Sequence, residues 1–496
     1  MGVLRRSATH RGRAGLTAIG GAVLLAAAAP VGLTQAHADP AASNQEVQDL
    51  RSELDAVKAE ADAAKAQAAE RARKIAELER RLDAATGAPP PEAPQPTTIQ
   101  QVEVADENPR DSQPETTPPI QSGSFNIFGF GQVDYIQDFN RVDPNWDATL
   151  RVSKIPTTPG EFGNDGQAII SVRQSRFGVE ADQQIAGKDL YVKFDFDLFG
   201  VGANEGQTTF RLRNFYGKWG PLLIGQTDTL WMDGDIFPNT IDYWGPTGMV
   251  FLRNPQIRFT WKSGPNEMAG AIEQPSNDVD PGDARIADPA LAGVHGNEIM
   301  PDFTGRYRYD GSWGHFQIAG ILRDVGFETP GTPGNQPNGS ELGWGLDVTS
   351  NLKPTKNDVI HLGVVFGRGI ASYMNDGGTD LAPGGTATLT GPDAIRAEAV
   401  GLVGIVAYLD HQWSKYLSSS IGYSRSEVDN TSLQSFDAFH VGQYASVNLL
   451  WTPDPHIMMG AEYIWGQRED KDGATGDDNR IQFSAKFKFS SKDFFQ

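Results

Sequence analysis

The chain has 496 residues, and 63 Asp and Glu against 42 Lys and Arg give a formal net charge of −21. This bulk charge argues against a nucleic-acid binder, and the absence of Cys excludes disulfide and thiolate chemistry. Glycine is abundant at 55 residues, and no apolar run beyond the N-terminal segment reaches the ~18 residues of a membrane helix. The composition is typical of a large all-β protein, including one whose strands alternate between lipid and water.

The first 38 residues have the pattern of a secretory signal peptide. Four arginines between positions 5 and 13 precede the apolar stretch "LTAIGGAVLLAAAAPVGL", and "AHA" at 36–38 is a small-x-small cleavage site. The alternative is a single-pass anchor, but the apolar stretch is short and rich in Gly and Ala. We therefore expect cleavage after Ala38 and a mature protein in the cell envelope, still more acidic than the precursor.

Residues 43–83 repeat with a seven-residue period, which predicts a coiled coil. Alanines and Arg71 occupy the middle of the seam, so we expect the coiled coil to assist assembly rather than to drive it alone. The alternative is a lone solvated helix. The predicted core positions at the two ends are Val47, Leu50, Leu54, Val57, Ile75, Leu78 and Leu82.

Residues 84–123 follow as a linker, because nine prolines fall between positions 89 and 119. A segment so rich in Pro is extended and semi-rigid, and it cannot build a hydrophobic core. The helical period therefore ends at this linker, and residues 124–496 form the next domain.

From residue 124 onward the apolar residues recur with a period of two, which predicts strands. In "LYVKFDFDLF" (190–199), for example, Leu, Val and Phe alternate with Lys and Asp. Short turns alternate with long loops, the pattern of an outer-membrane barrel. A soluble all-β domain of this length would usually split into two. We expect an all-β transmembrane barrel of 16 antiparallel strands, starting near 126, 168, 190, 208, 222, 256, 267, 302, 312, 341, 358, 399, 416, 438, 456 and 479.

The polar face of such a barrel lines a water-filled lumen. In "TTFRLRNFYGKWG" (208–220), strict alternation places the two arginines and Phe215 inside, and Phe210, Leu212 and Tyr216 outside. Inward acids (Glu180, Asp195, Asp197 and Glu462) are fewer than inward cations, which favours anions; pairing between the two is the alternative. The predicted pore-lining cations are Arg176, Lys193, Arg211, Arg213, Arg258, Lys262, Arg306, Arg308, Arg323, Lys486 and Lys488.

The long connection 230–255 is too apolar to lie in solvent, since it carries two Trp, two Phe, a Tyr and two Met. It is the third long loop, and we expect it to fold into the lumen as a constriction, with its acids facing the arginines of the second to fourth strands. The alternative is a loop that contacts a neighbouring subunit. The residues that we assign to the constriction are Asp233, Asp235, Phe237, Asp242, Tyr243 and Trp244.

"FYGKWGPLLIGQT" and "DIFPNTIDYWGPTGMVFLRNPQIRFTW" (215–261) resemble the DcaP-like outer-membrane porins. The order of signal peptide, coiled coil, Pro-rich linker and barrel is similar to the layout of the same family. The resemblance implies a homotrimer in the outer membrane of a Gram-negative-type bacterium, a periplasmic coiled coil, and diffusion of small anionic solutes such as dicarboxylates. One departure concerns the final residue, Gln496, because such barrels usually end in an aromatic residue that is read during assembly.

Other classes of function find less support in the sequence. No G-x-S-x-G motif is present and the eight His are scattered, so we expect neither an enzyme nor a bound cofactor or metal. The acidic runs at 277–283 and 470–479 do not fit the EF-hand pattern for Ca²⁺. A structural protein whose coiled coil tethers the envelope is the alternative to a porin, although no recognisable wall-binding domain precedes the barrel.

Overall fold

The computed structural model describes residues 123–330, 334–385 and 395–493. The predicted signal peptide, the coiled coil and all but the last residue of the linker lie outside these residues, as does Gln496. No helix in the described part of the chain combines the length and the apolar character needed to cross a membrane.

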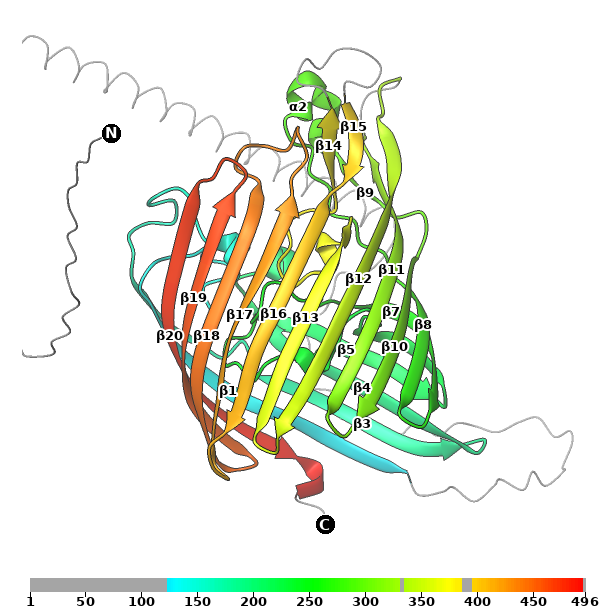
Figure 1. Ribbon diagram of the computed structural model, residues 1–496, viewed down its shortest axis with the longest axis vertical. Coiled ribbons are helices and arrows are strands. Elements are labelled where there is room, and N and C mark those ends of the chain that lie inside the picture. The colour runs from blue at the N-terminus through cyan, green and yellow to red at the C-terminus, as the bar shows by residue number, and fades with distance from the viewer. Residues whose placement is uncertain (1–122, 331–333, 386–394, 494–496) are drawn as a thin grey trace, which may run out of the picture. The chain divides into compact units, whose positions relative to one another are not determined.

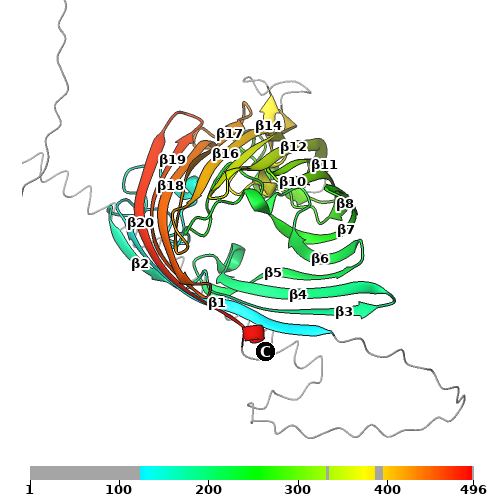
Figure 2. The same cartoon turned by 60° about the horizontal axis from the view of Figure 1, so that its bottom comes forward.

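Sixteen antiparallel strands form a closed barrel, as predicted from the alternation (Figures 1 and 2). β2 and β3 are two pieces of one strand, since both pair with β1. The barrel closes where β1 pairs with β20, so no backbone edge faces lipid. The strands are β1 (Ser124–Asp138), β2 (Gln167–Ser171), β3 (Arg176–Ile185), β4 (Lys188–Phe199), β5 (Thr208–Trp219), β6 (Leu222–Asp228), β7 (Arg253–Ser263), β8 (Asn266–Glu273), β10 (Asp302–Gly311), β11 (Gly314–Glu328), β12 (Asn338–Thr355), β13 (Asp358–Arg368), β16 (Gly401–Gln412), β17 (Leu417–Asp429), β18 (Phe439–Asp454), β19 (Ile457–Asp470) and β20 (Thr475–Ser490).

The connections alternate in length, and the short ones gather at one rim of the barrel. Turns such as 220–221 and 264–265 contrast with loops such as 139–166 and 229–252 at the other rim. Short turns face the periplasm in outer-membrane barrels and long loops face the exterior. The loops carry the remaining elements, which are β9 (His295–Asn297), β14 (Leu381–Gly385), β15 (Ile395–Ala399), α2 (Ala284–Ala287) and short 3₁₀ turns.

The outer face of the barrel is apolar, as a lipid-facing surface must be. Leu, Ile, Val and Phe side chains alternate outward along the strands, and five exposed tryptophans lie at or near the short turns. Such aromatic rows mark the interface between the apolar membrane core and water. The tryptophans are Trp219, Trp261, Trp313, Trp413 and Trp451.

A β-bulge in β5 changes which side chains face the lumen. The register against β4 passes from Leu212 opposite Phe196 to Asn214 opposite Asp195, and so skips Arg213. Arg213 and Asn214, 7% and 9% exposed, both point inward, and the alternation is reversed beyond them. Phe215 is therefore 57% exposed on the outer face.

Beyond the bulge Tyr216 pairs with Lys193, which faces the lumen. The strict alternation that placed Phe215 inside and Tyr216 outside was therefore wrong at these two positions. The extra residue in the strand is the cause.

Part of the barrel interior is filled by apolar cores that three loops bring in. Trp231 of loop 229–252 and Tyr373 of loop 369–380 pack with inward residues of β11, β13, β16 and β17. Leu150 of loop 139–166 packs beside Tyr444 of β18 and neighbouring residues of β16 and β19. Burial of this apolar surface stabilises the folded loops at about 25 cal/mol per Å², which explains why such apolar loops do not lie in solvent.

Candidate functional site

Loop 229–252 crosses the inside of the barrel and contacts distant parts of its wall. The indole nitrogen of Trp231 donates a hydrogen bond to the carbonyl of Ala319 on β11, 3.2 Å away. Further along the loop, the side chain of Asn448 on β18 donates to the carbonyl of Asn239 at 2.7 Å. Glu462 on β19 accepts bonds from the backbone N–H groups of residues 241 and 242. The loop is therefore fixed near its start and at its middle.

Asp233 fixes the first part of the loop to β10, β11 and β12. It is 3% exposed and accepts hydrogen bonds from His315 at 2.7 Å and Thr349 at 2.6 Å. Burial alone would raise the pKa of Asp233, but the bonds from His315 and Thr349 and the charge of Arg308 outweigh it and lower the pKa. Arg308 also pairs with the loop residue Asp235 at 2.6 Å. We call these five side chains the loop latch.

Asp242 fixes the second part of the same loop to loop 139–166. Its carboxylate accepts bonds from the hydroxyl of Thr149 at 2.8 Å and from the backbone N–H of Leu150 at 3.1 Å. Burial raises the pKa of Asp242. The indole nitrogen of Trp244 donates to the carbonyl of Asn375, 2.7 Å away, which adds loop 369–380 to the assembly.

The acids of loop 229–252 thus pair differently from the sequence expectation. Asp233 and Asp235 form their ion pairs with Arg308 on β10, and not with arginines of β3 to β5. The loop meets Arg213 through a hydroxyl, because the Tyr243 oxygen lies 2.7 Å from that guanidinium. The pattern of alternation shows which strand residues face inward, but it carries no information about the path of the loop between them.

Arg211 and Arg213 share a single carboxylate, that of Asp197 on β4. Its oxygen Oδ2 lies 2.7 Å from Arg211 and 2.9 Å from Arg213, and it accepts a bond from the Tyr243 hydroxyl at 2.6 Å. Tyr243 in turn stacks on Phe199 with ring centroids 4.1 Å apart. Two guanidinium groups on one carboxylate leave a local excess of one positive charge.

A cavity of about 310 Å³ lies between loop 229–252 and the barrel wall. Arg176, Arg213, Arg253 and Lys486 line its wall side, from β3, β5, β7 and β20. Arg253 pairs with Asp228 at 2.8 Å. Within the described part of the chain, no ion pair is formed by Arg176 or Lys486, whose charged groups lie 5.5 and 4.7 Å from the ring centre of Phe130. We call these four cations and the facing loop the constriction.

The other predicted pore-lining residues lie outside the constriction. Arg306 and Lys262 both pair with Glu267, and Lys262 is 67% exposed at a short turn. The guanidinium of Arg258 donates to the carbonyl of Asp228. Lys193 and Lys488 lie on the inner faces of β4 and β20.

The side chain of Arg323 on β11 does not face the open lumen. Its ion pairs and hydrogen bonds are with residues of β10 and of the long loops. It is fully buried and pairs with Asp302 at 3.0 Å and with Asp380 at 3.1 Å. It also donates to the carbonyls of Gly369 and Ser276. This cation therefore holds the long loops against the barrel, and its charge is neutralised.

Arg253 is a constriction residue that the sequence did not predict. It is the first residue of β7, and strict alternation from Arg258 assigns it to the outer face. At the junction with the loop the chain turns inward, and the guanidinium lies 4.7 Å from the ring centre of Phe251 and lines the constriction. The feature of the sequence that could have identified Arg253 is its position at the end of an apolar loop.

Comparison with known proteins agrees with the fold. Residues 107–489 match the model of the DcaP outer membrane protein family. A search of curated proteins returned no match. The crystal structure of the outer membrane channel DcaP of Acinetobacter baumannii is similar with a TM-score of 0.61 and 20% identity, over 74% of this chain and 97% of that one.

Two other porins are more distant. OmpT of Vibrio cholerae has a TM-score of 0.44 and 10% identity, over 75% of this chain and all of that one. The anion-selective porin from Comamonas acidovorans has a TM-score of 0.45 and 8% identity, over 74% and 100%. The family match spans most of the chain, and the closed 16-stranded barrel is the fold of a channel of the outer membrane and not of an enzyme. The chain belongs to the DcaP outer membrane protein family.

Proposed function

We propose that this porin is a water-filled channel through which small anions, such as dicarboxylates, diffuse more readily than cations. The observation that carries the proposal is the presence in the constriction of two cations, Arg176 and Lys486, that form no ion pair within the described part of the chain. Cations that line a pore lower the barrier for anions and raise it for cations. The positions of Arg213 and Arg253 beside them add to this field.

The pairing of the loop acids supports the same sign of selectivity. Asp233 and Asp235 share Arg308 as their ion-pair partner on the opposite wall, and neither of them lines the cavity of the constriction. Asp242 lines the cavity, and its carboxylate accepts hydrogen bonds from Thr149 and Leu150 of loop 139–166. Four cations and two carboxylates, those of Asp228 and Asp242, line the cavity, so its lining has an excess of positive charge although the whole chain is acidic.

The reversal potential under a salt gradient tests this function. The full chain would be inserted in a planar bilayer with KCl at tenfold different concentrations on the two sides. We expect the sign of the reversal potential to show that Cl⁻ permeates better than K⁺, and the preference to weaken at high salt, where charges are screened. A potential of the opposite sign would contradict the proposal.

We further propose that three copies of the chain form the functional unit. β6 and β8 have 7 and 8 residues, fewer than the ~9–11 that a tilted strand needs to span the bilayer. Next to them, outward phenylalanines of β3, β4, β5 and β20 contact one another as a group (Phe177, Phe194, Phe196, Phe210, Phe215 and Phe489). A neighbouring subunit would cover this side of the barrel, where the strands are short and the outer face is rich in phenylalanine.

The N-terminal coiled coil would assist this assembly from the periplasm, because β1 begins at the rim of the short turns. We expect the purified full chain to have the mass of a trimer, and deletion of 43–122 to lower the temperature at which the trimer dissociates. A monomeric mass would contradict the trimer. An unchanged trimer together with increased detergent sensitivity of the cells would favour the tether instead.

A further inference from the structure

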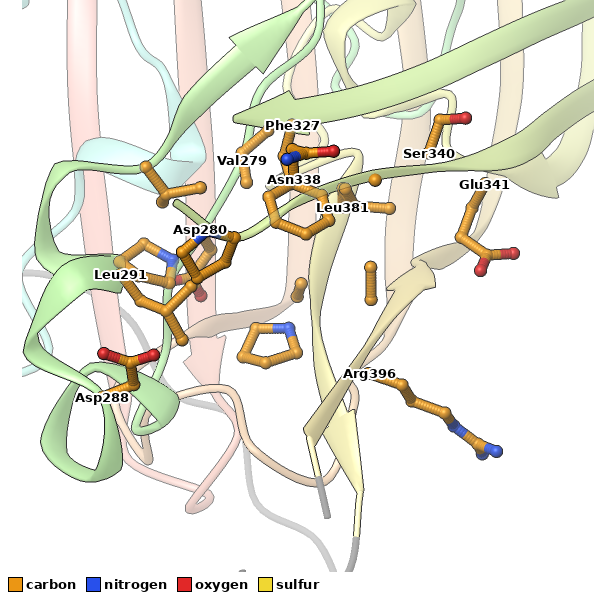
Figure 3. Close-up of a pocket in the computed structure, with 17 residues that line it drawn as sticks. Val279, Asp280, Asp288, Leu291, Phe327, Asn338, Ser340, Glu341, Leu381 and Arg396 are labelled. Atoms are coloured by element: carbon orange, nitrogen blue, oxygen red, sulfur yellow. The ribbon is translucent and has the colours of Figure 1, made fainter. Parts of the chain in front are cut away.

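A second cavity, of about 480 Å³, lies among the long loops and shares no lining residue with the constriction (Figure 3). Its walls come from residues 279–294, from residues 337–341 at the start of β12, and from the β14–β15 hairpin. By the orientation of the barrel this cavity lies on the exterior side. Its size is within the range of small-molecule sites, about 300–1,000 Å³.

The walls of this cavity are held in place by bonds between loops. The backbone N–H of Asp280 donates to the carbonyl of Leu381 at 3.0 Å, and the hydroxyl of Thr431 donates to the carbonyl of Pro383 at 2.7 Å. Gly282 has φ +49°, and a Cβ at that position would lie 2.2 Å from the carbonyl oxygen of Leu433. Glycine is thus required where the loop approaches its neighbour, and the cavity is preformed.

The interior of the cavity is mainly apolar, with Leu291, Val294, Phe327 and Leu381 in its walls. Ligand sites commonly combine such a lining with a few polar groups. An apolar molecule of suitable size would therefore leave water when it enters, and it would gain about 25 cal/mol per Å² of buried apolar surface.

The polar groups of the cavity are predominantly acidic. Asp288 and Glu341 lie on different sides of it in Figure 3, and Asp280 lies nearer its centre. One oxygen of Asp288 accepts the backbone N–H of Ala290 at 3.0 Å. The cationic lining residue, Arg396, is paired with a carboxylate 2.7 Å away, that of Glu398. A positively charged group would complement the remaining carboxylates.

We propose that this cavity binds a small organic cation, with an apolar body in the pocket and an ammonium group at the acidic rim. This site is additional to the channel and has the opposite charge preference from the constriction. Its existence does not depend on the selectivity of the pore, so each proposal can fail without the other.

Binding of dansylcadaverine to the full chain tests the site, because this probe joins an apolar fluorescent ring to a primary ammonium group. We expect saturable binding, seen as a rise in fluorescence. The double variant D288N/E341Q removes the acids on both sides of the cavity and should weaken binding by about fivefold, because the single ammonium group pairs with one partly exposed carboxylate. The matched control D165N/D472N removes two acids from other loops and should leave binding unchanged.

Two further measurements separate this site from partition of the probe into detergent. The N-acetylated, neutral probe should bind several-fold more weakly than the cation. Ala397→Trp should fill the cavity and abolish binding, while single-channel conductance stays unchanged and shows that the barrel is folded. Binding that does not saturate, that is equal for the neutral probe, or that persists in both cavity variants would overturn the proposal.

Discussion

Replacing the two cations of the constriction that form no ion pair in the described part of the chain, R176Q/K486Q, should reduce the ratio of anion to cation permeability by about tenfold. A unit charge about 8 Å from a passing ion contributes on the order of 0.5–2 kcal/mol for effective dielectric constants between 80 and 20. Two such charges therefore contribute about 1–4 kcal/mol, a range that includes the ~1.4 kcal/mol that corresponds to a factor of ten. The reversal potential in a planar bilayer under a KCl gradient measures the change.

The control for this prediction removes two lysines outside the constriction, K356Q/K415Q, at exposed short turns. It changes the net charge by the same amount and should alter the permeability ratio by less than about twofold, because the exposed charges are screened over a Debye length of about 10 Å at 0.1 M salt. R211Q should also have a smaller effect, since Arg211 shares its partner Asp197 with Arg213. Equal effects in all three variants would mean that the constriction does not set selectivity.

Asp233→Ala should release the loop latch and raise the conductance and the current noise of the channel. The substitution leaves buried donors on His315 and Thr349 without an acceptor, which costs about 1–3 kcal/mol. The control is Asp235→Ala, because Asp235 is 60% exposed in its side chain and its pair with Arg308 is worth about 0–1 kcal/mol. Single-channel recordings of the two variants distinguish them, and equally quiet channels would show that the latch does not hold the loop.

Acid should act on the same latch in the wild-type channel. The pKa of Asp233 is lowered in the folded state, so its contribution to stability is complete above the ordinary value of 3.8 and is lost as the pH falls through the lowered value. We expect quiet currents at pH 7 and at pH 5, and increased noise only below about pH 4. The currents of the Asp233→Ala channel should be noisy at every pH. An increase in the noise of the wild-type channel near pH 6 would indicate that a different group titrates.

Much of the architecture could be predicted from the sequence, because a transmembrane barrel repeats one simple pattern. A period of two places apolar groups in lipid and polar groups in water, and turns of two residues leave little freedom for the strands they join. The sixteen strand positions and the alternation of short turns and long loops follow from this pattern alone. The family resemblance rested on residues 215–261, where the unusual loop adjoins two strands.

The predictions were wrong where one residue more or less changes the geometry. The bulge at Arg213 reverses the faces of Phe215 and Tyr216, and a strand sequence contains no direct sign of such an inserted residue. Arg253 was not predicted to line the constriction for a related reason. It is the first residue of β7, and the alternation of side chains along the strand does not extend to this junction with the loop.

The sequence by itself therefore determined the class of fold, the number of strands and most of the cations that lie on the inner face, because these depend on local periodicity. The tertiary structure decided which of those cations are paired with carboxylates and which are not. Arg323 is neutralised by Asp302 and Asp380, from β10 and a distant loop, whereas Arg176 lines the constriction and forms no ion pair with any residue that the structure describes. Neutralisation depends on distances of a few ångströms between residues far apart in the chain, and these distances exist only once the loops have folded into the barrel.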